Sequence, residues 1–139
     1  MATEKLRRRR DRGAAAVEFA LVLPLLVMIL FGIMEFGYAF LIQAQVAGAA
    51  RVGVRSYAIN WNTTAAQDTA AQNTAIAIAK SQVPVPADAS GAFTSKCVTA
   101  GSQTTLTLTY QYHSLTGLLD GVLGPNIKVT VKGSMACGG

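Results

Sequence analysis

One apolar run near the N-terminus limits what this chain can fold into. From Phe19 to Met34 no side chain is charged, and with residues 14–17 the run reaches 21 residues, interrupted only by Glu18. About 20 helical residues, at roughly 1.5 Å each, cross the ~30 Å hydrocarbon core of a bilayer. The sequence therefore predicts a membrane-spanning helix, which we place at residues 14–42.

The positive charge of the chain lies in front of this helix. The formal net charge is +5, and residues 1–12 hold six of the 12 basic side chains against two acidic ones. Only Arg51 and Arg55 follow the apolar run within about 20 residues, so the positive-inside rule predicts a cytosolic N-terminus. We expect residues 1–13 to be a basic cytosolic leader, disordered in solution. The chain is then a single-pass protein of the cell membrane, with everything after about Phe40 outside the cytosol.

The rest of the chain is nearly neutral. Residues 13–139 carry six basic and five acidic side chains. A surface for nucleic acid needs basic residues spread over a folded face, beside groups that read or stack on bases. We therefore expect no nucleic-acid partner.

Glu18 is the fifth residue after Gly13. A carboxylate alone in hydrocarbon costs several kcal/mol, so an acidic residue in a membrane helix points to function. Basic residues, then a glycine, then a long apolar helix with glutamate at its fifth position form the pattern of type IV prepilins and pseudopilins. The fuller run RDRGAAAVEFALVLPLLVMILFGIMEFGYAF, followed by AARVGVRSYA, closely resembles the TadE-like proteins of the tight-adherence (Tad/Flp) pilus system.

The resemblance implies a processing site. By similarity, a membrane-embedded prepilin peptidase would cut between Gly13 and Ala14 and release the leader. The new α-amino group of Ala14 would be mostly a cation at neutral pH, and Glu18, one helical turn later, is its natural counter-charge. The two groups could pair within one chain, or Glu18 of an incoming subunit could pair with the amine of the subunit before it. The alternative is an unprocessed anchor in which Glu18 lies shallow enough to reach headgroup water.

The resemblance also implies partners. We assign Glu18 and Phe19 to subunit docking, with other pilins or pseudopilins of the Tad system as the binding partners. The predicted function is that of a TadE-like minor pilin or pseudopilin in the assembly of a Tad (Flp) type IV-like pilus. The alternative function is an unprocessed, signal-anchored binding or adhesion module.

A second glutamate marks the far end of the predicted span. Glu35 lies 17 residues beyond Glu18, or about 25 Å along a helix, so it would emerge near the outer interface. Phe36 and Tyr38 supply aromatic rings of the kind that settle at headgroup level. We assign Glu35, Phe36 and Tyr38 to the membrane interface, and favour an anchoring role for Glu35 over a subunit contact.

The helical pattern continues beyond the membrane. In residues 43–58, Val46, Ala50 and Val54 form one stripe at four-residue spacing, while Gln43, Ala47, Arg51 and Arg55 form another. We predict a stem that continues the first helix, then a second helix at residues 64–80, so that residues 43–83 are an extracytoplasmic helical part. The pairs Ala44/Gly48 and Ala49/Gly53 would let another helix or the protein's own head domain approach closely.

The C-terminal part, residues 84–139, reads as a small antiparallel β domain. Strands are predicted at residues 93–99, 104–112 and 127–135; the second alternates Leu106, Leu108, Tyr110 and Tyr112 with polar residues. The fold class is α+β and pilin-like: a long N-terminal transmembrane helix continuing as a stem, a second helix and a three-stranded sheet. The aliphatic loop SLTGLLDGVLG, residues 114–124, could cap the core, touch the membrane or meet a partner; we favour capping.

The chain has two cysteines and one histidine. Cys97 would lie in the first strand and Cys137 just after the third. In an exported domain this pair predicts a disulfide, which is worth about 3–4 kcal/mol by loop-entropy estimates. Two cysteines and His113 make a poor ligand set, so no metal or cofactor is expected.

Catalysis has no support in the sequence. His113 and Ser114 are neighbours on a predicted strand and would point to opposite faces, so they cannot form a nucleophile–base pair there. The chain shows no glycine-rich phosphate motif, paired-acid site or zinc motif. We expect a protein that is not an enzyme and that has no small-molecule substrate.

Overall fold

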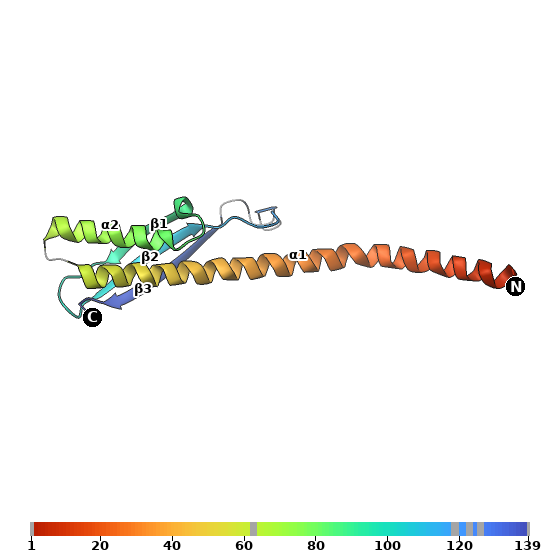
Figure 1. Cartoon of the computed structure of the whole chain (residues 1–139), viewed down its shortest axis with the longest axis horizontal. Coiled ribbons are helices and arrows are strands. Elements are labelled where there is room, and N and C mark those ends of the chain that lie inside the picture. Colours follow the sequence, from red (N-terminus) through yellow and green to blue (C-terminus); the bar gives the residue numbers. More distant parts are fainter. Residues whose placement is uncertain (1, 62–63, 118–119, 122–123, 125–126, 139) are drawn as a thin grey trace.

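The computed structural model describes residues 2–61, 64–117, 120–121, 124 and 127–138, with the backbone alone for residues 2–12. A long helix extends far beyond a small head, in which a second helix and three strands gather around its C-terminal half (Figure 1). The elements are α1 (Ala2–Asn60), α2 (Ala65–Ser81), the 3₁₀ turn η1 (Pro86–Asp88), β1 (Ala89–Ser95), β2 (Gln103–Gln111) and β3 (Lys128–Ala136). The predicted α+β class is confirmed, including the helix that continues as a stem.

Helix α1 is one uninterrupted element of 59 residues that includes Pro24. At about 1.5 Å per residue it is roughly 88 Å long. It already starts at Ala2, so the expectation of a disordered leader is wrong for the backbone. The leader is rich in arginine, a good helix former, and it extends an existing helix, which avoids the cost of a new nucleus.

The three strands form an antiparallel sheet in the order β1-β2-β3. Strand β2 lies in the middle, with Leu108 opposite Gly91 on one side and Val131 on the other. The predicted alternation in β2 is confirmed, since Leu106, Leu108 and Tyr110 are buried.

The first strand differs most from its prediction. It begins at Ala89 and ends at Ser95, instead of running from residue 93 to 99, so Cys97 lies beyond the strand. Its first four residues are Ala, Ser, Gly and Ala, a run with no β-branched or aromatic side chain to indicate a strand. They pair with β2, and Gly91 leaves room there for Ile76 of α2, whose side chain lies 3.2 Å from where a Cβ would stand.

The head has two layers. Helix α1 covers β2 and β3, and α2 covers β1, all on one face of the sheet (Figure 1). The opposite face is polar, and hydroxyl groups bond across it from Thr105 to Ser134 and from Thr109 to Thr130, at 2.9 and 3.2 Å. The core between the layers contains Ile42, Val46, Ala49, Ala50, Val54, Ala79, Val83, Ala89, Leu106, Leu108, Tyr110 and Tyr112.

Small residues let the layers approach closely. A Cβ added to Gly53 of α1 would lie 2.7 Å from the side chains of Ala79 and Leu106. A Cβ added to Gly133 of β3 would lie 2.8 Å from the carbonyl oxygen of Ala50. The pair Ala49/Gly53 therefore faces the protein's own head, whereas Gly48 is exposed and a Cβ there would meet nothing within 4 Å.

The contrast between the two stem glycines gives a matched test. We expect Gly53→Ala to lower the free energy of unfolding by about 1–3 kcal/mol relative to Gly48→Ala, because overpacking a filled core costs that much. Both changes gain the same helix propensity, about 0.8–1.0 kcal/mol, so the difference isolates the steric effect. Chemical unfolding in detergent, followed by circular dichroism, measures it; equal stabilities would show that the core at Gly53 is loosely packed.

Candidate functional site

The N-terminal half of α1 stands clear of the head. From Gly13 to Met34 no residue is buried, and Glu35 is the first buried residue after Gly13. This part of the helix is long and apolar enough to cross a membrane. The 21 residues from Ala14 to Met34 span about 31 Å, which matches the ~30 Å hydrocarbon core.

The four residues assigned to processing and docking lie in this head-free stretch. Gly13, Ala14, Glu18 and Phe19 are helical and exposed. A Cβ added to Gly13 would meet no atom within 4 Å among the residues whose side chains the structure describes. The structure brings none of them to the head, so their assigned roles remain predictions.

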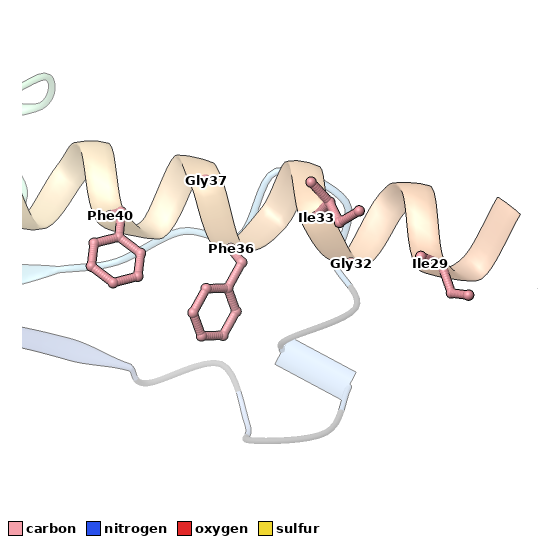
Figure 2. A pocket seen from close by; sticks show the side chains of 6 residues that line it. All are labelled: Ile29, Gly32, Ile33, Phe36, Gly37 and Phe40. Carbon is pink, nitrogen blue, oxygen red and sulfur yellow. The ribbon is translucent and has the colours of Figure 1, made fainter. Parts of the chain in front are cut away.

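An open apolar hollow lies on α1 where the head begins (Figure 2). The rings of Phe36 and Phe40 lie side by side, with centroids 5.8 Å apart. Glu18 precedes Phe36 by 18 residues, or five turns of about 3.6 residues, so it shares this face of the helix. The hollow is lined by Ile29, Gly32, Ile33, Phe36, Gly37 and Phe40.

Sequence reasoning missed the two glycines of this hollow. Gly32 and Gly37 are exposed, and a Cβ added to either would meet no atom of the described residues within 4 Å, so no contact among those residues requires a glycine there. The available signal was two glycines in an otherwise bulky apolar helix, a feature that lets helices approach closely in membranes.

Glu35 occupies the junction between the head-free helix and the head. Its side chain is 2% exposed. Oε1 accepts hydrogen bonds from Tyr112 Oη at 2.9 Å and from the Leu115 amide at 3.0 Å. Oε2 accepts from the Thr116 amide at 3.0 Å and from Thr116 Oγ1 at 2.8 Å. Each carboxylate oxygen thus has two donors, which offsets the cost of burying a charge.

Tyr112 is held in the donor form that this cluster needs. Burial, followed by its hydrogen bond to the Glu35 carboxylate, raises the pKa of Tyr112 well above its usual range. The phenol, which is already protonated at neutral pH, therefore remains a donor into the alkaline range where a free tyrosine would ionise. Of the other residues assigned to the interface, Tyr38 is half-buried with its ring 5.9 Å from that of Tyr112, and Phe36 is exposed.

The intramolecular role of Glu35 was not foreseen from the sequence. Its partners follow it by 77 to 81 residues, just past the end of β2. An isolated glutamate at the end of an apolar run gives no local sign of such distant donors. Its assignment to the membrane interface remains a prediction, and the structure adds a contact that joins helix to sheet.

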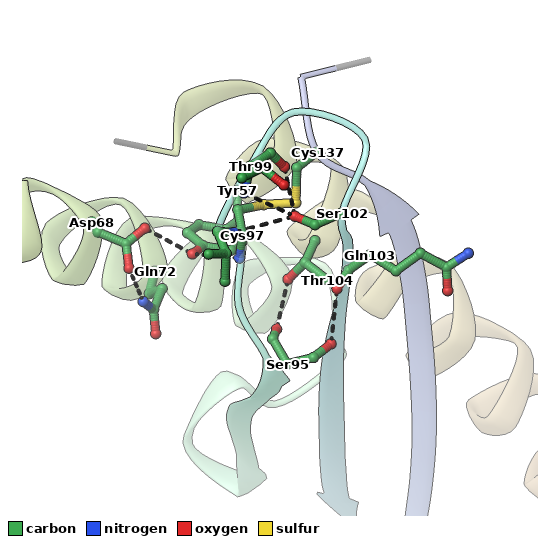
Figure 3. Close-up of a disulfide and its surroundings, with 11 residues drawn as sticks. Tyr57, Asp68, Gln72, Ser95, Cys97, Thr99, Ser102, Gln103, Thr104 and Cys137 are labelled. Carbon is green, nitrogen blue, oxygen red and sulfur yellow. Dashed lines mark hydrogen bonds between the residues drawn. A yellow bond between two sulfur atoms is a disulfide. The ribbon is translucent and has the colours of Figure 1, made fainter. Parts of the chain in front are cut away.

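The opposite end of the head is closed by the predicted disulfide. Cys97 and Cys137 are bonded, with a sequence separation of 40 residues, which confirms the pairing (Figure 3). Closing a loop of this length is worth about 4 kcal/mol in the chain-entropy model. Tyr57 of α1 lies beside the bond: its hydroxyl accepts from the Cys97 amide at 3.2 Å and donates to Asp68 of α2 at 2.7 Å.

The remaining polar side chains near the loop after β2 have separate partners. His113 Nε2 lies 2.9 Å from Asp88, while Ser114 Oγ donates to Asp120 at 2.9 Å. His113 and Ser114 thus form no nucleophile–base pair with each other. Within the part of the chain that the structure describes, no three His, Cys, Asp or Glu side chains gather as they would around a metal ion.

The predicted aliphatic loop is described only in part. Leu118, Leu119, Val122 and Leu123 lie outside the described residues. Leu115, the remaining aliphatic residue of that loop, is 63% exposed, so it does not cap the core. The preference for core capping is wrong at this position.

Comparison with protein families locates a match in the N-terminal half. Residues 13–55 match the family model of the TadE-like protein, which confirms the resemblance over that segment. The matched residues include the head-free helix, the hollow and Glu35, and end before α2 and the sheet. Searches of curated proteins and of solved structures gave no match. With its exposed apolar helix, the chain fits a single-pass membrane protein associated with a Tad pilus.

The Glu35 cluster predicts a stability effect. We expect Glu35→Gln to lower the free energy of unfolding of the head by about 2–3 kcal/mol, because an amide turns its NH₂ group toward backbone donors and leaves them unpaired. Glu18→Gln is the matched control: it removes the same charge from the same helix at an exposed position and should leave stability unchanged. Chemical unfolding in detergent checks both variants, and a Glu35→Gln head as stable as the control would refute the role of the cluster.

Proposed function

We propose that this protein is a TadE-like minor pilin or pseudopilin that acts in the assembly of a Tad (Flp) type IV-like pilus and docks through its N-terminal membrane helix. The observation that carries the proposal is the placement of Gly13, Ala14 and Glu18 on a helix segment that lies within the family match and is free of the head. In this role the protein performs no catalysis. Its partners are the membrane, a prepilin peptidase and other pilins or pseudopilins.

Processing at Gly13 is compatible with the local structure. The bond between Gly13 and Ala14 lies inside α1, so local opening of the helix would expose it to the peptidase. Glycine makes this step easier, since it is about 0.5–1 kcal/mol less favourable than alanine in a helix interior. Cleavage there releases the basic leader and leaves an amine one turn before Glu18.

Docking through the helix is supported by the face that carries Glu18. The same face presents the hollow around Gly32 and Gly37, where a neighbouring helix could approach closely. Glu35, one residue before Phe36, points about 100° away around the helix and is occupied by the protein's own head. The docking face and the head-binding face are therefore separate, so a subunit can dock without disturbing the head.

The orientation proposed is N-terminus in the cytosol and head outside. The basic residues before the apolar run support it by the positive-inside rule. The disulfide at the far end of the head supports it as well, because such bonds persist in oxidising compartments.

One observation favours the alternative of an unprocessed, signal-anchored binding or adhesion module. Helix α1 runs without a break from Ala2 across Gly13. A leader that remains part of the helix shields the bond between Gly13 and Ala14 from a peptidase. A retained leader would keep the basic N-terminus in the cytosol and leave the protein as a permanent membrane anchor for its head.

The N-terminus of the mature chain separates the two functions. We expect intact mass and N-terminal sequencing of protein from native membranes to give a chain that starts at Ala14. The Gly13→Val variant should keep its leader and start at Met1, or at Ala2 if the initiator methionine is removed. The change alters the cleavage site without a steric conflict among the described residues. A wild-type chain that keeps the leader would refute the pilin proposal and support the anchored module.

The docking role of Glu18 has its own test. We expect Glu18→Gln to reduce both pilus output and co-isolation of the protein with other Tad pilins about tenfold or more, because each 1.4 kcal/mol lost from an interaction is a factor of 10. Glu18→Asp keeps the charge and should retain much of both. Normal pilus output and normal co-isolation of the Glu18→Gln variant would refute the docking role, provided that the variant is inserted and cleaved as the wild type is.

A further inference from the structure

The loop that follows β2 reaches back toward the head-free helix. We call residues 112–117 the proximal loop, because its first residue, Tyr112, and the amides of Leu115 and Thr116 all bond to Glu35. In Figure 1 the chain after β2 extends past the sheet, in the direction of the N-terminus of α1. The disulfide lies at the opposite end of the head, beside Tyr57.

The hydrogen bonds fix the height of the proximal loop along α1. The head-free residues Ala14–Met34 match the thickness of the hydrocarbon core, so Glu35 stands at its boundary. Helical side chains lean toward the helix N-terminus, so the Glu35 carboxylate lies closer to the membrane than its own Cα. The Leu115 amide, 3.0 Å from that carboxylate, is therefore held at the level where acyl chains meet headgroups.

The side chains at this level are apolar and exposed. Leu115 is 63% exposed although its backbone is fixed, and Phe36, the residue after Glu35 on α1, is 65% exposed. Phe40, one turn further out, is also exposed and lies about 8 Å beyond Glu35, near the outer edge of the interfacial layer. Aromatic and aliphatic side chains at this depth gain free energy from lipid that they cannot gain from water.

We propose that the proximal loop is a second membrane contact, in which Leu115 inserts among lipids of the leaflet on the side of the head. Leu115 contacts lipid and not another protein, because the hydrogen bonds to Glu35 place it at the depth where the membrane-spanning part of α1 ends. This contact holds the head against the bilayer surface, in addition to the single helix that anchors it. The inference rests on the membrane-spanning helix of the proposed function.

Tryptophan fluorescence in vesicles tests this contact. The full chain with Trp61→Phe carries no other tryptophan, and in this background Leu115→Trp, Val98→Trp and Phe31→Trp each supply one probe. Val98 is 76% exposed beside the disulfide at the far end of the head, and Phe31 lies in the head-free helix. Each protein is reconstituted into phosphatidylcholine vesicles, with and without bromine on the acyl chains near the headgroup.

We expect brominated lipid to reduce the emission of Leu115→Trp and Phe31→Trp by about twofold or more, because both probes would lie within reach of acyl chains. Val98→Trp should be unchanged. Adding Glu35→Gln to Leu115→Trp should weaken the quenching, since it releases the loop from its fixed height. The same addition to Phe31→Trp should have no effect.

The outcomes distinguish the two proposals. Quenching of Phe31→Trp without quenching of Leu115→Trp would overturn the loop contact alone, and would indicate that water or another protein surface meets Leu115. Absence of quenching in Phe31→Trp would overturn the membrane anchor and the loop contact with it. Quenching of Val98→Trp as strong as that of Leu115→Trp would overturn the loop contact as the specific site, because both ends of the head would then meet lipid.

Discussion

The carboxylate of Glu35 is the interaction on which the arrangement of this protein depends. It belongs to the helix that leaves the head, and its four hydrogen bonds come from the chain just beyond β2. Glu35 lies at the point where α1 changes its surroundings: before it the helix is exposed on all sides, and after it one face of the helix is buried against the head. Apolar contacts are not directional, whereas four converging donors specify one register between helix and sheet.

The head is closed at both ends around a thin core. Glu35 and Tyr112 close the end near the head-free helix, and the disulfide with Tyr57 and Asp68 closes the other. Between these ends the layers meet closely at Gly53, Ala79 and Gly133, and the core is a single layer of buried side chains between helices and sheet. A core of this size supplies limited stabilisation, and directional bonds at its two ends supply the rest.

Periodic and local features could be predicted from the sequence. The spacing of Val46, Ala50 and Val54 predicted the buried stripe of the stem, and the alternation in β2 predicted its inward face. Two cysteines in a domain expected to be exported predicted their bond. The first two signals depend on residues close together in the sequence. The third depends on the chain having two cysteines, so that one pairing is possible.

Features that depend on distant contacts could not be predicted. The donors to Glu35 come from residues 77 or more positions later, and no pattern around Glu35 indicates them. The start of β1 was missed because Ala, Ser, Gly and Ala become a strand only through pairing with β2. The family resemblance located Gly13 and Glu18, whereas the segment that matches the family model ends at residue 55 and contributes to the head only the buried face of α1.

A single helix connecting the membrane segment to the far end of the head acts as a lever. Pro24 removes the backbone hydrogen bond to the carbonyl of Ala20 and loosens the membrane part of α1 at that turn. From Pro24 to Asn60 the helix extends about 54 Å, so a change of about 10° at the proline displaces its distal end by about 9 Å. Because hydrogen bonds join Tyr57 near that end to Asp68 of α2 and to the Cys97 amide beyond β1, and the core packs against the same helix, the head would follow the helix. Small rearrangements among helices inside the bilayer would thereby become large displacements of the surface that the protein presents outside it.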